Sequence, residues 1–230
     1  MGIKIDLKQN QNDLLADSFD EIILKMMQKN NNKKMKSLLF CGSEPRVGTT
    51  KIAINMSISL AQGNNKTIFL DSDMRKSSKK KHLSKNSPHG LSDYFEAKAT
   101  LAEIINQTNI DNLDYISCGN SSIQSTKTLL LNNFTTLISD LEKNYDFILF
   151  DSPSLDVVND ATVLSILVDG IFFIIELGKT TKSNINKMIK TFEESHNKFL
   201  GVIINKVDQH EYRTYIRNYD YFHKLRTQLI

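Results

Sequence analysis

Six short apolar segments alternate with helical segments along this 230-residue chain. The apolar segments span 36–41, 66–71, 113–117, 146–151, 170–176 and 200–205, and several are apolar at nearly every position. Strands of this kind belong in a parallel sheet that helices cover on both faces. Apolar residues recur at helical spacing over 49–62, 91–97, 100–107, 126–143, 160–168 and 181–196. The alternation predicts a doubly wound α/β fold, with a mostly parallel sheet between two helical layers.

The two ends of the chain differ from this pattern. Residues 13–29 carry apolar side chains at helical spacing and predict an N-terminal helix, whereas residues 1–12 are polar and we expect them to be loose. Residues 209–230 form a tyrosine-rich tail. Because we find neither an internal repeat nor a linker-like composition, we expect residues 1–230 to form a single domain.

Composition excludes several classes of protein. No apolar run approaches the roughly 18 residues that a membrane span needs, and no signal segment opens the chain, so we expect a cytoplasmic protein. Cys41 and Cys118 stand in apolar segments and predict buried thiols rather than a disulfide framework or a metal site. The net charge is +3, and much of the excess lies in the Lys-rich run 75–85. That run has no interleaved aromatic residue, so we expect no nucleic-acid partner; a solvated loop, an anionic membrane surface and an acidic partner stay open.

The residues that follow the strands carry the functional prediction, because open parallel sheets bind ligands beyond the carboxyl ends of their strands. The segment SEPRVGTTK (43–51) follows the first strand and has part of the P-loop pattern G-x-x-x-x-G-K-[ST]. Gly48 and Thr50 match this phosphate-binding pattern. Ser43 stands where the pattern has its first Gly, and Thr49 stands where it has Lys. The alternative is a plain strand–loop–helix turn in which a Thr caps the helix.

Acidic residues follow two further strands. Asp71 and Asp73 end one strand two residues apart, an arrangement that suits magnesium and its waters or a base that accepts a hydroxyl proton. Arg75 comes next and is able to contact phosphate or pair with an acid. Asp151 ends another apolar strand, which is the form of a Walker B segment. The alternative for these acids is a solvated turn or a helix cap.

The last strand ends in IINKVD, in which Asn205, Lys206 and Asp208 match N-K-x-D, the guanine-reading motif of GTPases. A motif this short is common by chance, and an Asn at a strand end also suits adenine through its side-chain amide. Four features nevertheless occur in this order, each at the end of its own strand: the P-loop segment, Asp71 with Asp73, Asp151, and the motif that begins at Asn205. Their order argues against coincidence and for a nucleotide site.

With these motifs the chain resembles the bacterial tyrosine kinases (BY-kinases) of capsule and exopolysaccharide operons, within the wider MinD/ParA-like P-loop group. The resemblance covers the chain from about residue 13 to the C-terminus. It rests on SEPRVGTTK for Walker A, FLDSDMR (69–75) for Walker A′ and FILFDSPS (147–154) for Walker B. GLSDYF (90–95) and LGVIINKVD (200–208) also resemble the corresponding family segments.

The resemblance implies ATP and Mg²⁺ as cofactors and assigns roles to residues. Asp71 would activate the incoming tyrosine hydroxyl, Asp73 and Asp151 would organise magnesium, and Thr50 would bind it through its hydroxyl; Arg75 would belong to the Walker A′ signature. The nucleotide would be held by Ser43, Arg46, Val47, Gly48, Thr49, Thr50, Lys51 and Asn205. The tyrosine cluster that family members autophosphorylate in trans would be Tyr212, Tyr215, Tyr219 and Tyr221, for which an amphipathic tail helix is the alternative.

The resemblance also implies partners. Family members often assemble as rings and are stimulated by a membrane-anchored polysaccharide co-polymerase whose cytoplasmic tail acts as an adaptor. We therefore expect recruitment to the inner face of the cell membrane through such a partner on a separate chain. The oligomer would contain further copies of this chain or an active kinase paralogue.

Three departures from the family pattern leave the activity open. Thr49 replaces the Walker Lys, at an expected cost of about 10²–10⁴-fold in rate, and Arg46 replaces a loop Gly. Lys51 does not substitute, because two positions rotate it by about 200° around a helix; Arg46 is the candidate to supply charge from within the loop. The N-terminal motif E-x-x-R-x-x-R lacks both Arg, and 117–130 lacks the family's prolines.

Three functions fit this sequence. The first is an active tyrosine kinase, and the second is a catalytically impaired pseudokinase or scaffold that binds the co-polymerase. The third is a MinD/ParA-like ATPase or a GTPase. The acids of Walker A′ and B favour the first function, and the missing Walker Lys favours the second.

Overall fold

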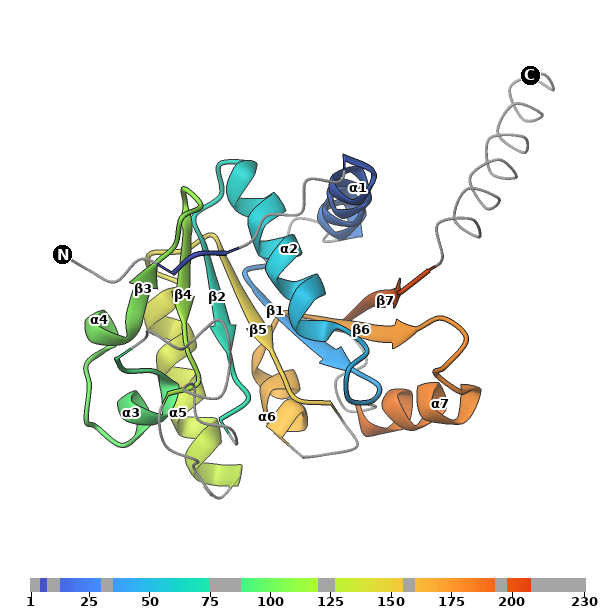
Figure 1. Ribbon diagram of the computed structural model, residues 1–230. Coiled ribbons are helices and arrows are strands. Elements are labelled where there is room, and N and C mark those ends of the chain that lie inside the picture. Colours follow the sequence, from blue (N-terminus) through green and yellow to red (C-terminus); the bar gives the residue numbers. More distant parts are fainter. Residues whose placement is uncertain are drawn as a thin grey trace.

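A computed structural model describes residues 5–7, 13–29, 35–74, 88–119, 127–154, 160–192 and 198–207. Arg75, the Lys-rich run 75–85, Asp208 and the tyrosine cluster of the tail lie outside the described residues. One seven-stranded sheet has the strand order β3-β4-β2-β5-β1-β6-β7 (Figure 1). The strands are β1 (Ser37–Gly42), β2 (Thr67–Asp71), β3 (Ile105–Gln107), β4 (Leu113–Ile116), β5 (Phe147–Asp151), β6 (Gly170–Glu176) and β7 (Phe199–Asn205).

Every strand pairing is parallel except that of β3 with β4. All side chains of β1, β2 and β5 are buried, as their apolar sequences require for strands covered on both faces. The predicted doubly wound, mostly parallel sheet is therefore confirmed.

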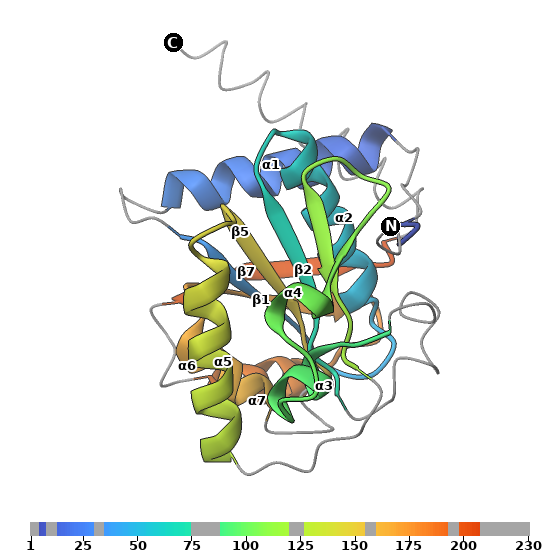
Figure 2. The same ribbon diagram turned by 90° about the vertical axis from the view of Figure 1, so that its left-hand side faces the viewer.

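Two helical layers cover the sheet (Figures 1 and 2). One face carries α1 and α2, whose apolar side chains pack with those of the strands into one core. The other face carries α3 to α7, which build a second core with the opposite sides of the same strands. The helices are α1 (Asp13–Lys29), α2 (Thr49–Gln62), α3 (Leu91–Phe95), α4 (Leu101–Ile104), α5 (Lys127–Leu141), α6 (Asp160–Leu167) and α7 (Lys182–Thr191).

Helix α1 and helix α2 have the predicted bounds, and the prediction of buried thiols at Cys41 and Cys118 is confirmed. The motif E-x-x-R-x-x-R falls on Asp17, Asp20 and Ile23 of α1, and the last two of these positions attach α1 to the rest of the fold. Ile23 is buried in the core under α1, and Ser59 of α2 donates a hydrogen bond to Asp20 of α1 at 2.9 Å.

None of the helices that the structure describes is long and apolar enough to cross a bilayer.

The prediction of a helix over 100–107 is wrong in its second half. Glu103 accepts hydrogen bonds from Thr100 and caps α4, but the helix ends at Ile104. Residues 105–107 form β3, which pairs antiparallel with β4. A short apolar run has no periodicity of its own that separates helix from strand, so pairing with the sheet edge decides.

The prediction that residues 1–12 are loose is wrong for residues 5–7. Ile5 pairs with Thr108, and its backbone exchanges hydrogen bonds with the Gln107 carbonyl and the Asn109 amide. Ile5 is 4% exposed and Leu7 is 1% exposed, so this segment extends the core beyond α1. The signal in the sequence is the alternation of Ile5, Asp6 and Leu7, which was too short to predict a strand.

Replacing Leu7 with Ala is expected to lower the free energy of unfolding by about 2 kcal/mol, because it removes a buried side chain at the margin of the core. Urea denaturation measures the change. Asp6→Ala is the matched control, since the neighbouring Asp6 side chain is exposed and its loss should change the stability little. Equal effects of the two substitutions would contradict the packing of residues 5–7.

Candidate nucleotide-binding site

The sheet order brings the predicted motif residues to one edge. Strand β5 lies between β2 and β1, and its Asp151 is in register with Asp71 of β2 and Phe40 of β1. The residues that follow Phe40 lead into the segment SEPRVGTTK. The carboxyl ends of three neighbouring strands therefore supply both acids and the P-loop, as this sheet type predicts for a ligand site.

The loop over 43–48 connects β1 to the N-terminus of α2. Gly48 has φ +94°, and a Cβ at this position would lie 2.3 Å from Asn205 Nδ2, so only glycine fits. Helix α2 begins at once with Thr49, and its first turn, TTKI, contains no acid. The unpaired N–H groups and the positive end of the helix dipole favour an anion at this terminus.

Arg46 occupies a position at which the family pattern has glycine, and it adopts the conformation that glycine prefers. Its φ is +69°, in the left-handed region. That conformation costs a residue with a side chain roughly 1–2 kcal/mol. The loop therefore keeps its backbone path despite the substitution, and the Arg46 side chain is exposed.

Thr49 stands at the position of the Walker Lys and its side chain turns toward the end of β1. A Cβ at Gly42 would lie 2.5 Å from Thr49 Oγ1, so the hydroxyl fills the space above Gly42. Lys51 lies two positions further along α2 and is exposed. The sequence prediction that Lys51 faces another direction agrees with the helical position of both residues.

Candidate oxygen ligands for Mg²⁺ lie where the ends of β2 and β5 face the start of α2. Thr50 Oγ1 donates a hydrogen bond to Asp151 Oδ2 at 2.5 Å, and Asp71 and Asp151 are each 6% exposed. The described part of the chain holds no cluster of three or more His, Cys, Asp or Glu side chains that could bind a metal. A hydroxyl and a carboxylate nevertheless fit Mg²⁺, which usually binds one or two carboxylates and takes its other ligands from phosphates and water.

Two serines that the sequence interpretation missed hold these acids in place. Ser72 donates hydrogen bonds from its backbone N (3.0 Å) and its hydroxyl (2.7 Å) to the Asp151 carbonyl. Ser152 donates in the same way to the Phe40 carbonyl, at 3.1 Å from each group. Both serines are buried. The signal was the Asp-Ser pair that ends both strands, which extends the pairing of neighbouring strands by one residue.

The remaining predicted residues lie around this centre. The Asp73 backbone N donates to Asp71 Oδ1 at 3.2 Å, so the two acids are neighbours. Ser43 is 2% exposed, and its hydroxyl lies 3.2 Å from Thr180 Oγ1. Asn205 Nδ2 donates to the Val47 carbonyl at 2.7 Å, so this amide contacts the loop itself.

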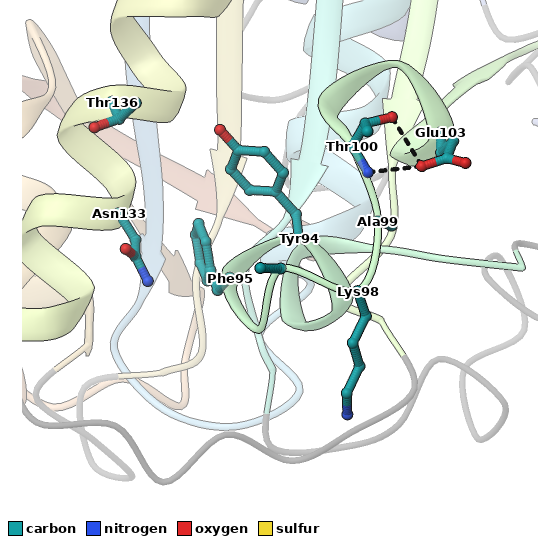
Figure 3. A pocket seen from close by; sticks show the side chains of 9 residues that line it. Tyr94, Phe95, Lys98, Ala99, Thr100, Glu103, Asn133 and Thr136 are labelled. Carbon is teal, nitrogen blue, oxygen red and sulfur yellow. Dashed lines mark hydrogen bonds between the residues drawn. The ribbon is translucent and has the colours of Figure 1, made fainter.

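A separate hollow of about 540 Å³ lies between the α3–α4 segment and α5 (Figure 3). Its lining includes Tyr94, Phe95, Lys98 and Glu103, and it shares no residue with the loop or the two aspartates. Its charged groups have local roles: Glu103 caps α4 by accepting hydrogen bonds from Thr100, which lower its pKa, and Lys98 pairs with Glu96 at 2.6 Å. We therefore assign the chemistry to the loop.

Comparison with known proteins agrees with this geometry. The sequence pattern of the AAA domain family matches residues 35–204. The putative tyrosine-protein kinase CapB of Staphylococcus aureus is 28% identical over 84% of this chain and 85% of its own length. Tyrosine-protein kinase CpsD of Streptococcus pneumoniae serotype 4 is 30% identical over 76% of this chain and 78% of its own length.

The chain belongs to the BY-kinase family of P-loop proteins. The crystal structure of the chimerical protein CapA2B2 superposes on this BY-kinase chain with a TM-score of 0.79 at 23% sequence identity, over 90% of this chain and 95% of that one. The fold and the family of the sequence prediction are thus confirmed.

Proposed function

We propose that this chain is a tyrosine-protein kinase of capsular or exopolysaccharide biosynthesis that binds ATP and Mg²⁺. The observation that carries the proposal is the hydrogen bond from Thr50 to Asp151, beside Asp71 and at the mouth of the phosphate loop. The family relationship supports the reaction class, because the relative CpsD is named a tyrosine-protein kinase.

The residues of the site have distinct tasks in this proposal. The backbone N–H groups of the loop and of the first turn of α2 bind the phosphates. Thr50, Asp73 and Asp151 hold magnesium, which neutralises charge on the phosphates when it is bound. Asp71 accepts the proton of the attacking tyrosine hydroxyl. Arg75, the last residue of the Walker A′ segment, assists these residues.

The tail supplies the acceptor. Tyr212, Tyr215, Tyr219 and Tyr221 lie within ten positions, and a second copy of the chain or an active paralogue phosphorylates them in trans. A membrane-anchored polysaccharide co-polymerase recruits residues 1–230, as one domain, to the inner face of the cell membrane.

Incubation with labelled ATP and Mg²⁺ tests the activity. The full chain should gain phosphotyrosine, and a variant with all four tail tyrosines replaced by Phe should lose most of the label. Tyr94→Phe is the control, because Tyr94 lies outside the tail and its replacement should leave the label unchanged. The other tyrosines outside the tail, Tyr115 and Tyr145, are buried and are less suitable. Label that survives in the four-Phe variant would contradict the tail as acceptor.

A second function, a scaffold without phosphoryl transfer, is favoured by one observation. Thr49 places a hydroxyl over Gly42 where the family has a lysine side chain, so the loop offers no cation at that position. The same docking on the co-polymerase would remain. Such a scaffold gains no phosphotyrosine under any condition of the assay above.

A further inference from the structure

The N-K pair at the end of β7 has a use that the proposed function does not include. Asn205 Nδ2 donates to the Val47 carbonyl at 2.7 Å, and Lys206 Nζ donates to the Arg46 carbonyl at 2.8 Å. Two consecutive carbonyls in the middle of the phosphate loop are therefore held by two consecutive side chains that lie about 160 residues further along the chain.

We propose that Asn205 and Lys206 are positioning residues for the phosphate loop, and that they allow this chain to carry Arg at position 46 in place of glycine. We call these two side chains, together with Glu176, the loop latch. This inference rests on the proposed nucleotide site, whose phosphate grip it explains.

The geometry of the peptide bond gives the latch its effect. In a trans peptide the N–H points away from the C=O. Side chains that hold the carbonyls of Arg46 and Val47 toward β7 therefore turn the N–H groups of Val47 and Gly48 away from β7. Consecutive N–H groups on one side of a loop form an anion-binding concavity.

Arg46 is where this restraint matters most. Its φ of +69° is a conformation that glycine visits freely and that other residues populate roughly tenfold less. The Lys206 bond is made to the carbonyl of this same residue. Lys206 itself has φ +58°, so the chain turns sharply after β7 and returns the ammonium group to the loop.

Glu176 at the end of β6 completes the latch. Its carboxylate pairs with Lys206 Nζ at 2.9 Å and with Lys179 Nζ at 3.3 Å. The hydrogen bond from Lys206 is the main cause that lowers the pKa of Glu176, and the hydrogen bond from Lys179 lowers it further. The Glu176 backbone N also donates to Thr180 Oγ1, which in turn donates to Glu44 Oε1 in the loop, each at 3.0 Å. The connection after β6 thus holds the start of the loop while β7 holds its centre.

The latch also bears on base recognition. The Asn205 amide donates to the loop in this structure, whereas N-K-x-D predicts that it reads guanine. A positioning role predicts that loss of either side chain weakens ATP and GTP alike, because phosphates are common to both. A base-reading role predicts the loss of one nucleotide alone.

A double-mutant comparison tests the proposal. Lys206→Met should raise the Kd for Mg·ATP about tenfold in the natural background and at most about twofold in an Arg46→Gly background, since glycine adopts the left-handed conformation without help. Lys179→Met is the matched control: Lys179 pairs with the same Glu176 and is 47% exposed against 45% for Lys206. The control should leave the Kd within about twofold, and Lys206→Arg should restore most of the affinity.

Hydrogen exchange of the nucleotide-free protein gives a readout that does not depend on binding. Lys206→Met should raise the exchange rates of the Ser43 and Ile52 amides, which donate to the Ile174 and Gly48 carbonyls at the two margins of the loop, several-fold. The rates of β5 should stay unchanged, which also shows that the variant is folded. If the natural protein binds no nucleotide, the proposed function fails, and the hydrogen-exchange result alone tests whether the latch positions the loop. Unchanged exchange, an equal loss in the natural and the Arg46→Gly backgrounds, or a loss confined to GTP would each overturn it.

Discussion

Replacing Thr49 with Lys should raise the rate of tyrosine autophosphorylation about 10²–10³-fold, the usual size of one charge-stabilising contact in a transition state. Phosphoryl transfer depends on positioning and on neutralising the charge of the transferred group, and this position is where the P-loop pattern has its cation. The rate is measured as phosphotyrosine formed per minute with saturating ATP and Mg²⁺.

Thr49 is half-buried, so a longer side chain at position 49 starts from a site that reaches solvent. Gly42 has no side chain below it, and the first turn of α2 exposes Thr50 and Lys51. Lys190→Ala is the control, because Lys190 is exposed on α7 and lies outside the loop; it should change the rate less than about twofold. A Thr49→Lys variant that is folded yet no faster would show that another cation already serves this site.

Replacing Asp151 with Asn should reduce autophosphorylation at least about 10²-fold and abolish the effect of magnesium on nucleotide affinity. Asn keeps the shape of Asp and an oxygen that can accept the hydrogen bond from Thr50, but it removes the charge that attracts the metal. Calorimetric titration of ADP with and without Mg²⁺ measures the loss.

Asp114→Asn is the matched control for this prediction. Asp114 lies on β4 of the same sheet, where its carboxylate accepts a hydrogen bond from the Tyr145 hydroxyl at 2.7 Å and takes no part in the loop. Burial and this bond raise the pKa of Tyr145, so the phenol remains a donor. Magnesium-dependent binding that survives in Asp151→Asn and fails in Asp114→Asn would contradict the placement of the metal.

Much of this fold could be predicted because its strands are apolar on both faces. Such strands have one stable environment, a parallel sheet between helices, and the acids that follow them mark the carboxyl edge. For this reason the sequence predicted that Asp71, Asp151 and the loop form one site. The short β3 and the segment at residues 5–7 could not be predicted, because only contacts with distant strands decide their conformation.

The latch could not be predicted from sequence for a different reason. Asn205 and Lys206 match a base-reading motif, and no local pattern shows that their side chains bend back to the carbonyls of Val47 and Arg46. Likewise, in the sequence Arg46 is only a departure from the glycine of the family pattern. The structure instead shows the residue in the glycine conformation, with its side chain in solvent.

The central claim is that this loop still binds a nucleotide through phosphate and magnesium. Calorimetric titration of the natural protein with ATP, ADP and GTP, each with Mg²⁺, tests it most directly. We expect ATP and ADP to bind with micromolar Kd and the affinity to fall when magnesium is removed. No binding up to millimolar nucleotide, from a protein shown to be folded, would contradict the enzyme and leave the scaffold.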